Sequence, residues 1–414
     1  MSEVINTPSE DSKKRPLEEE ETKVVDVKKQ RVETDRIKRK KVALLLSYSG
    51  QGYLGMQRNP GMKTIEEDLM MALLKAGLIT EDAFNTPQLI QFQRAARTDK
   101  GVSAARQVVS IKLPEDTKVE AINECLPEQI RVMAVKRVTK GFNSKSSCDA
   151  RTYSYMLPTF AFMPLDKELS ETYRITPEVV ANVKATLKLF EGTHNFHNFT
   201  ARKKPLDPSA NRYIMSFDID EPFVNRELEF AVVRVKGQSF MLHQIRKMVG
   251  LTIAVARGHT SVDTLQRAWK TERLDLPVAP GLGLVLEEVH YDRYNQRFGK
   301  DGIHEPLDWT EVDSDVTAFK EKFIFPTIVD SEIEEKSMLN WLETLALHSY
   351  SIREDNLSHG LTTLGQAADL VEEAEGEGNA LATLARAAQV VQENQNLYNG
   401  NPNQHPSRDS IPSA

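Results

Sequence analysis

The chain is expected to turn at residues 94–104, which read RAARTDKGVSA. Runs rich in β-formers flank this stretch at Leu89–Phe92 and Val108–Leu113, so it should form a loop between two strands. Asp99 is the single carboxylate of the loop and stands among three cations. Nearby positive charge lowers the pKa of a carboxyl group, so Asp99 should be ionised and available as a nucleophile or base. Taken alone, the stretch is also typical of a charged turn with surface ion pairs.

Length and composition indicate an intracellular protein with a substantial core. The chain has 414 residues, enough for two domains, and 40% of them are hydrophobic. No apolar run approaches the roughly 20 residues that span a bilayer. The polar and charged N-terminal region does not resemble a signal peptide. Two cysteines, Cys125 and Cys148, are too few for a disulfide framework or a cysteine-based zinc site.

The net charge of −7 is unevenly distributed along the chain. Residues 88–275 carry 29 Lys and Arg against 21 Asp and Glu, a net of +8. Residues 301–414 carry 6 against 21, a net of −15. The middle of the chain is therefore suited to binding a polyanion, and the C-terminal part is not.

Residues 1–40 are dense in Lys and Glu and low in aromatics, so they are expected to be a disordered arm. Basic clusters at Lys13–Pro16 and Lys28–Lys41 are typical of a nuclear-localisation signal or an RNA-contacting arm, and equally of a solvated tail. The acidic run Glu18–Glu21 argues against a transit peptide.

Two stretches, 42–160 and 175–292, each mix strands and helices, which is consistent with two similar α+β lobes around a cleft. The helices expected from apolar spacing include 177–190, 240–256 and 262–270, followed by acidic helical segments at 311–323 and 331–349 and one more helix at 381–391. The predicted organisation is an arm at 1–40, an N-terminal lobe at 41–170, a C-terminal lobe at 171–295, an acidic and mostly helical extension at 296–394, and a disordered tail at 395–414.

Two further segments carry candidate site residues. Strand alternation over 150–158 places Arg151 and Tyr153 on one face, which suits stacking against a base as well as ordinary aromatic packing. Arg246 lies in an apolar helical context and needs a carboxylate partner, for which Asp99 is a candidate.

The loop at 192–200 is polar and aromatic. Its two histidines, His194 and His197, have no third ligand nearby, so the sequence does not support a metal site there. The run Arg202-Lys203-Lys204 that follows is basic and suited to phosphate contacts.

Four stretches together resemble the TruA-type tRNA pseudouridine synthases, most closely their eukaryotic, fungal-like subgroup. They are residues 48–57 (YSGQGYLGMQ), 97–104 (RTDKGVSA), 192–200 (GTHNFHNFT) and 238–250 (QSFMLHQIRKMVG). The resemblance covers about residues 42–293, and the order of the four motifs makes it specific. Met56 stands where bacterial relatives usually have Trp, which points to the eukaryotic subgroup.

The resemblance implies a pseudouridine synthase fold, with a central antiparallel sheet in two lobes, flanking helices and, here, a C-terminal helical extension. It implies that Asp99 is the catalytic aspartate and that Arg246 pairs with it. Tyr153 would stack on the uracil and is a possible base, while Arg97 would help to displace the target nucleotide. Further substrate contacts are expected at Lys100, Arg151, Phe196, Phe199, Arg202, Lys203 and Lys204.

The implied activity is isomerisation of uridine in tRNA, with small nuclear RNA and mRNA as further candidate substrates. No cofactor is required for this chemistry, and the sequence offers no support for a structural zinc. The partner is RNA rather than a membrane, a monomer is favoured, and the nucleus is the expected compartment. Two alternatives stay open at this point: a non-catalytic RNA-binding or chaperone protein of the same fold, and a paralogue with a different tRNA site specificity.

Overall fold

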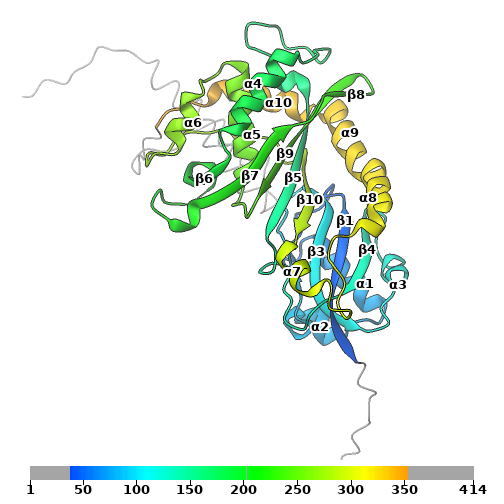
Figure 1. The fold of residues 1–414 in the computed structure, drawn as a ribbon. Helices are drawn as coiled ribbons and strands as arrows, with labels where there is room; N and C mark the ends of the chain where they lie inside the picture. The colour runs from blue at the N-terminus through cyan, green and yellow to red at the C-terminus, as the bar shows by residue number, and fades with distance from the viewer. Residues whose placement is uncertain (1–37, 202, 353–414) are drawn as a thin grey trace, which may run out of the picture. The chain divides into compact units, whose positions relative to one another are not determined.

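The computed structural model describes residues 38–201 and 203–352, and the described residues from Arg39 onward belong to one compact unit (Figure 1). At its centre lies a ten-stranded sheet with the order β4-β1-β3-β10-β5-β9-β7-β6, to which β2 is added at β3 and β8 at β9. The strands are β1 Arg39–Tyr48, β2 Gln93–Arg94, β3 Ser103–Pro114, β4 Ile130–Arg137, β5 Ala150–Pro158, β6 Gly192–Asn195, β7 Asn211–Ile219, β8 Phe223–Asn225, β9 Leu228–Gly237 and β10 Leu284–His290. The predicted α+β class with a central, mainly antiparallel sheet is confirmed.

Helices flank this sheet along its whole length. They are α1 Ile65–Lys75, α2 Glu81–Asn85, α3 Val119–Asn123, α4 Pro177–Lys188, α5 Gln244–Arg257, α6 Asp263–Ala268, α7 Asp292–Phe298, α8 Asp313–Phe319, α9 Phe325–Glu335 and α10 Ser337–Thr344. The α4 helix packs on β7 and on α5, and α3 packs on β4. Figure 1 shows α8 and α9 (yellow) running beside the sheet from the β4 end towards β8. None of the described helices is long and apolar enough to cross a bilayer.

The two halves of the sheet meet at β3 and β10. These two strands run parallel and share only the pairs Val285↔Ser103 and Leu286↔Ala104, whereas β10 and β5 pair over most of their length. The short pairing lies at the very start of β3, directly after the loop that carries Asp99. The loop therefore stands where the two halves of the sheet separate. The lobe boundaries given above stay predictions.

The structure corrects several expected element boundaries. The helix expected from residue 240 begins only at Gln244, because His243 adopts a left-handed backbone with φ 58°. Where separate acidic helices were expected at 311–323 and 331–349, residues 313–335 form one almost continuous helical run that includes a π-helical turn, and it breaks at Lys336, which has φ 52°, before α10.

Part of the second basic cluster belongs to the fold rather than to the arm. β1 begins at Arg39, and Lys41 is buried with its Nζ donating to the carbonyl of Gln91 at 2.7 Å. The first basic cluster, the helix expected at 381–391 and the tail expected at 395–414 all lie outside the described residues.

Candidate active site

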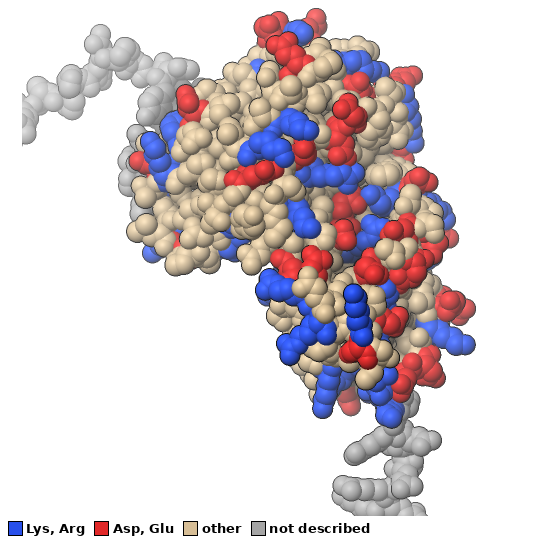
Figure 2. Space-filling model, in the orientation of Figure 1, with Lys and Arg blue, Asp and Glu red and all other residues tan. Residues whose placement is uncertain are grey.

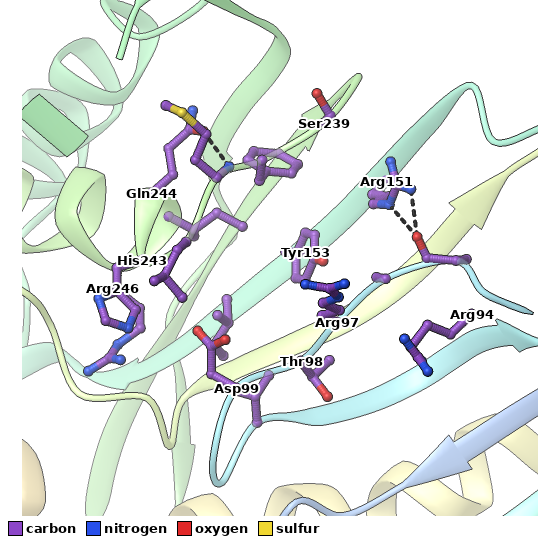
Figure 3. Close-up of a pocket in the computed structure, with 18 of the residues that line it drawn as sticks. Arg94, Arg97, Thr98, Asp99, Arg151, Tyr153, Ser239, His243, Gln244 and Arg246 are labelled. Atoms are coloured by element: carbon purple, nitrogen blue, oxygen red, sulfur yellow. Dashed lines mark hydrogen bonds between the residues drawn. The ribbon is translucent and has the colours of Figure 1, made fainter. Parts of the chain in front are cut away.

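A pocket of about 530 Å³ opens where the two halves of the sheet separate (Figure 3). Its walls come from the loop after β2, from β5 and from the segment that joins β9 to α5. The residues that line it are Gln93, Arg94, Ala95, Ala96, Arg97, Thr98, Asp99, Val102, Lys145, Arg151, Tyr153, Ser239, Phe240, Met241, Leu242, His243, Gln244, Ile245, Arg246 and Leu284. Asp99, Tyr153 and Arg246, predicted from separate parts of the sequence, are therefore brought to one cavity.

A buried amide holds the loop that carries Asp99. Gln107, fully buried in β3, accepts a hydrogen bond from the amide of Ala96 at 3.1 Å and donates to the carbonyl of Ala96 at 2.9 Å. The same amide nitrogen lies 3.4 Å from the hydroxyl of Tyr48, which is 2.8 Å from Thr98 Oγ1. Burial raises the pKa of Tyr48 to about 12, so its hydroxyl keeps its proton and can donate. Two positions just before Asp99 are thus fixed from the sheet.

The loop after β1 supports the loop that carries Asp99 from a second direction. The amide of Met56 donates to the carbonyl of Thr98 at 3.0 Å, and the amide of Gly101 donates to the carbonyl of Tyr53 at 3.2 Å. Gly55 has φ +104°, and a Cβ added there would lie 2.8 Å from the Thr98 carbonyl oxygen. Glycine at this position is needed for both the backbone conformation and the close approach.

Tyr153 presents its ring to the pocket from β5. Its side chain is buried, and it meets Phe240 edge-to-face with ring centroids 5.3 Å apart. Burial raises the pKa of Tyr153 above its ordinary value, and the charge of Asp99 acts in the same direction, although Arg151 opposes them. At neutral pH the group is a phenol, so the structure favours its use as an apolar platform over its use as a free phenolate base.

Arg246 enters the pocket from the first turns of α5. Its side chain is buried, and Nε donates to the carbonyl of Ala279 at 2.6 Å, which fixes the plane of the guanidinium. A Cβ added at Gly281 would lie 3.8 Å from Arg246 Cζ and 3.6 Å from the carbonyl oxygen of Lys100, so the guanidinium and the backbone next to Asp99 both adjoin Gly281. In Figure 3, Asp99 stands between Arg246 and Tyr153. The ion pair between Arg246 and Asp99 stays a prediction.

Comparison with known proteins identifies the chemistry. A sequence model of a family described as tRNA pseudouridine synthase matches residues 186–292. Pseudouridylate synthase 1 homolog of Mus musculus is 55% identical over 321 residues, which cover 76% of this chain and 76% of the relative. The homolog of Homo sapiens is 54% identical over 346 residues, covering 82% and 80%. The protein named tRNA pseudouridine synthase 1 of Kluyveromyces lactis is 33% identical, covering 82% of this chain and 76% of its own.

The chain belongs to the tRNA pseudouridine synthase family. The resemblance drawn from the four motifs is thereby confirmed, and the central sheet with its flanking helices is the pseudouridine synthase fold. The protein is an isomerase, and the non-catalytic alternative is set aside. Pseudouridine synthases of this family need no cofactor. Across residues 38–201 and 203–352, no group of three or more His, Cys, Asp and Glu could hold a metal ion.

The synthase carries an excess of positive charge in its pocket. On the face seen in Figure 2, Lys and Arg are interspersed with Asp and Glu, so charge of one sign is not gathered into one patch there. The pocket differs, because its lining has one carboxylate, Asp99, and five Lys or Arg side chains. These cations are Arg94, Arg97, Lys145, Arg151 and Arg246. This local balance suits a polyanionic substrate.

The predicted substrate contacts among these cations differ in their positions. Arg97 is exposed in the pocket, where it can meet a nucleotide. Arg151 is bound to the backbone of two walls, since Nη2 donates to the carbonyl of Ala95 at 2.6 Å and Nη1 to that of Gln238 at 3.2 Å. Arg151 therefore links the loop after β2 to the segment between β9 and α5. Lys100 is exposed, as expected, but it does not line the pocket.

The predicted RNA contacts in the loop after β6 require a correction. Phe196 and Phe199 are fully buried and pack on each other and on Trp269. Because their rings offer no exposed surface, they stabilise the fold and do not contact RNA in this structure. His194 stacks on Trp269 with ring centroids 4.5 Å apart.

The basic run after this loop is only partly described. Lys203 pairs with Asp207 at 3.0 Å, Lys204 is exposed, and Arg202 lies outside the described residues. Neither Lys203 nor Lys204 lines the pocket, so contacts from them to RNA stay predictions for a more distant part of the substrate.

Three functional positions were missed by the sequence reasoning. Gln107 had one available signal, a polar residue within the apolar strand 103–114. His243 lies in the HQIRK motif, but only the structure shows its left-handed backbone at the pocket edge. Lys145 gave no signal at all, because it lies in a short polar turn.

Proposed function

We propose that this synthase converts specific uridines of tRNA into pseudouridine, and that Asp99 is the carboxylate that starts the reaction. The proposal rests on one observation above all: Asp99, Tyr153 and Arg246 line a single pocket although they come from a loop, a strand and a helix far apart in the sequence. The yeast relative's name, tRNA pseudouridine synthase 1, supports tRNA as the substrate.

The reaction needs a carboxylate and a platform but no redox partner. The N1–C1′ bond breaks, a C5–C1′ bond forms, the proton on C5 leaves, and N1 gains a proton. A stacked base is out of reach, so the target nucleotide must first leave its stack. Arg97, exposed in the pocket, is the proposed residue that assists this displacement.

Each of the three central residues has a proposed role after the base is flipped. Asp99 begins cleavage, either by attack on the uracil ring or by removal of the C2′ proton. The ring of Tyr153, braced by Phe240, gives the detached uracil a flat surface on which to rotate. Arg246, oriented through its bond to Ala279, is the proposed charge partner of Asp99.

The test is Asp99→Asn with an exposed control, Asp116→Asn. Asparagine keeps the shape of the side chain but cannot attack or take a proton, so pseudouridine formation in unmodified tRNA should be abolished while tRNA binding persists. The control should behave as the native protein does. If the Asp99 variant made pseudouridine at the native rate, the proposed role of this residue would be wrong.

We further propose a nuclear location and additional RNA substrates. The support for the nucleus is the basic composition of Lys13–Pro16 and Lys28–Lys41. A fluorescent fusion that lacks residues 1–37 should lose nuclear accumulation. Pseudouridine maps of total RNA from cells with and without the protein would show which tRNA sites, small nuclear RNAs and mRNAs depend on it.

We propose that the synthase is a monomer. In support, the extension from Asp313 to Leu347 packs back onto the same chain, with Lys320 bound to Glu287 of β10 at 2.7 Å. Light scattering on the purified protein should give the mass of one chain, 46.7 kDa, and a mass of two chains would contradict this.

A further inference from the structure

We propose that Lys145 binds a backbone phosphate of the RNA beside the flipped uridine. This inference rests on the proposed function, because it places a contact at the mouth of the same pocket. Lys145 follows β4, in the turn that leads to β5, and none of the expected site residues lies in that turn. Three features of Lys145 support this contact: the partners of its side chain, the turn that carries it and the charge of the pocket around it.

The first feature is that no hydrogen bond or ion pair joins the Lys145 side chain to the part of the chain that the structure describes. Three of the five pocket cations already have protein partners: Arg94 pairs with Glu66 at 2.5 Å, Arg151 binds two carbonyls, and Arg246 binds the carbonyl of Ala279. Over the described residues, Arg97 and Lys145 have no hydrogen bond or ion pair from their side chains. With Arg97 proposed to assist flipping, Lys145 is the pocket cation left without a role.

The second feature is the rigid turn that carries Lys145. Ser144 is fully buried, and its Oγ donates to the carbonyl of Gln93 at 2.9 Å while its own carbonyl accepts from Tyr291 at 2.8 Å. On the other side, the amide of Lys145 donates to Asn143 Oδ1 at 2.9 Å. The exposed Lys145 side chain therefore extends from a backbone segment that is held by hydrogen bonds at Ser144 and at Lys145 itself.

The hydrogen bond from Ser144 also links the segment of Lys145 to the loop that carries Asp99. Gln93, whose carbonyl accepts this hydrogen bond, belongs to β2. The loop that carries Asp99 follows directly after β2. The position of Lys145 is therefore coupled to that of the loop by a partly buried hydrogen bond.

The third feature is the charge at the pocket mouth. The only carboxylate among the lining residues is Asp99, so an anion that enters from the Lys145 side meets mainly positive charge. A flipped uridine remains attached to the RNA through phosphates on both sides, and these must lie at the mouth when the base is inside. A flexible ammonium group suits such a phosphate, because it can follow the backbone without requiring one fixed geometry.

The experiment compares Lys145→Met and Lys145→Arg with a matched control, Lys140→Met. Lys140 is exposed on the same connection but does not line the pocket. The probe is a pool of unmodified tRNA transcripts. Its dissociation constant is measured over a series of KCl concentrations, and KM and kcat for pseudouridine formation are measured at a single KCl concentration. A phosphate contact adds about 0.7 to 0.9 to the slope of log K against log salt.

We expect Lys145→Met to lower that slope by about 1 and to raise KM about tenfold, the effect of losing one charge-assisted hydrogen bond. Its kcat at saturating tRNA should stay native, because the chemistry belongs to other residues. Lys145→Arg should restore both the slope and KM, and Lys140→Met should leave both unchanged.

Two results would overturn the proposal. The first is a native slope and KM for Lys145→Met in a preparation that makes pseudouridine normally. The second is an equal loss in Lys145→Met and Lys140→Met, which would indicate a diffuse charge effect rather than a contact at the pocket. If instead the native protein made no pseudouridine, the proposed function would fail, and the salt slopes would still decide whether Lys145 contacts RNA.

Discussion

The amide of Gln107 is predicted to hold Asp99 in its active position, and Gln107→Leu tests this directly. Leucine has a similar volume but no hydrogen-bonding groups, so the amide and carbonyl of Ala96 lose their partners at 3.1 and 2.9 Å. Ala96 is itself buried, so water replaces neither bond. Each buried polar group left unpaired costs about 1 to 3 kcal/mol, so the two together should destabilise the fold by about 2 to 6 kcal/mol.

The same substitution should also lower the activity of the molecules that remain folded. Asp99 lies three residues after Ala96, and a displacement of about 1 Å at a reacting group can lower turnover about 100-fold. Unfolding by urea gives the stability, and single-turnover pseudouridine formation at saturating tRNA gives the rate. Gln88→Leu, at an exposed position in the 3₁₀ helix Pro87–Ile90 that precedes β2, should change the stability by less than about 0.5 kcal/mol.

A second variant at this position separates hydrogen bonding from packing. In Gln107→Glu, a protonated carboxyl group can both donate and accept, as the amide does, whereas the ionised form cannot donate. Burial raises the pKa of such a group in the folded state, so its stabilising contribution is present at low pH and is lost as the pH rises through that raised pKa. Native stability and rate in Gln107→Leu would refute the reasoning, and a loss of stability with a native rate would refute the link to Asp99.

Three further outcomes are expected. Gly55→Ala should destabilise the protein by more than about 1 kcal/mol and lower kcat, because the new Cβ meets the Thr98 carbonyl at 2.8 Å and φ is +104°; urea unfolding and turnover check this. Lys320→Met should destabilise the protein by about 1.5 to 3 kcal/mol, because the buried carboxylate of Glu287 loses its ammonium partner at 2.7 Å while it keeps Ser154 Oγ at 2.6 Å and Arg234 at 4.0 Å. Adding Glu287→Gln should restore part of that loss, and urea unfolding of both variants checks this. Burial raises the pKa of Glu332 from 4.5 to about 7, so its contribution to stability is present below pH 4.5 and is lost as the pH rises through 7; Glu332→Gln should remove this part of the pH dependence of unfolding.

The sequence predicted parts of the site correctly where the pattern within a single strand or loop determines which way a side chain faces. The alternation at residues 150–158 placed Arg151 and Tyr153 on one face, and both line the pocket. This follows from the two-residue period of a strand, which depends on no distant part of the chain. The loop that carries Asp99 does connect two strands, β2 and β3, but the expected strand region Leu89–Phe92 was wrong, because Pro87–Ile90 is a 3₁₀ helix and β2 is only Gln93–Arg94.

The start of α5 was predicted wrongly because apolar residues at helical spacing also occur in segments that are not helical. Phe240 and Leu242 fit a helical stripe, yet here they line the pocket ahead of the helix. The helix begins where the side chain of Gln244 turns back to accept a hydrogen bond from the amide of Met241 at 2.9 Å. His243 then takes a left-handed conformation that costs about 1 kcal/mol or more, which the surrounding contacts must offset.

The exposure of a side chain was the property that the sequence could not provide, and it changed two functional assignments in opposite directions. Phe196 and Phe199 looked like RNA contacts, but they are covered by Trp269, about 70 residues further along the chain. Lys145 looked like part of an ordinary polar turn, yet it is brought to the pocket by Ser144, whose partners belong to β2 and to the residue after β10. In both cases the deciding contact joins segments that are distant in sequence. A site built at the meeting point of two half-sheets depends mainly on such contacts, so its motifs identify the reaction more readily than they identify every residue that touches the substrate.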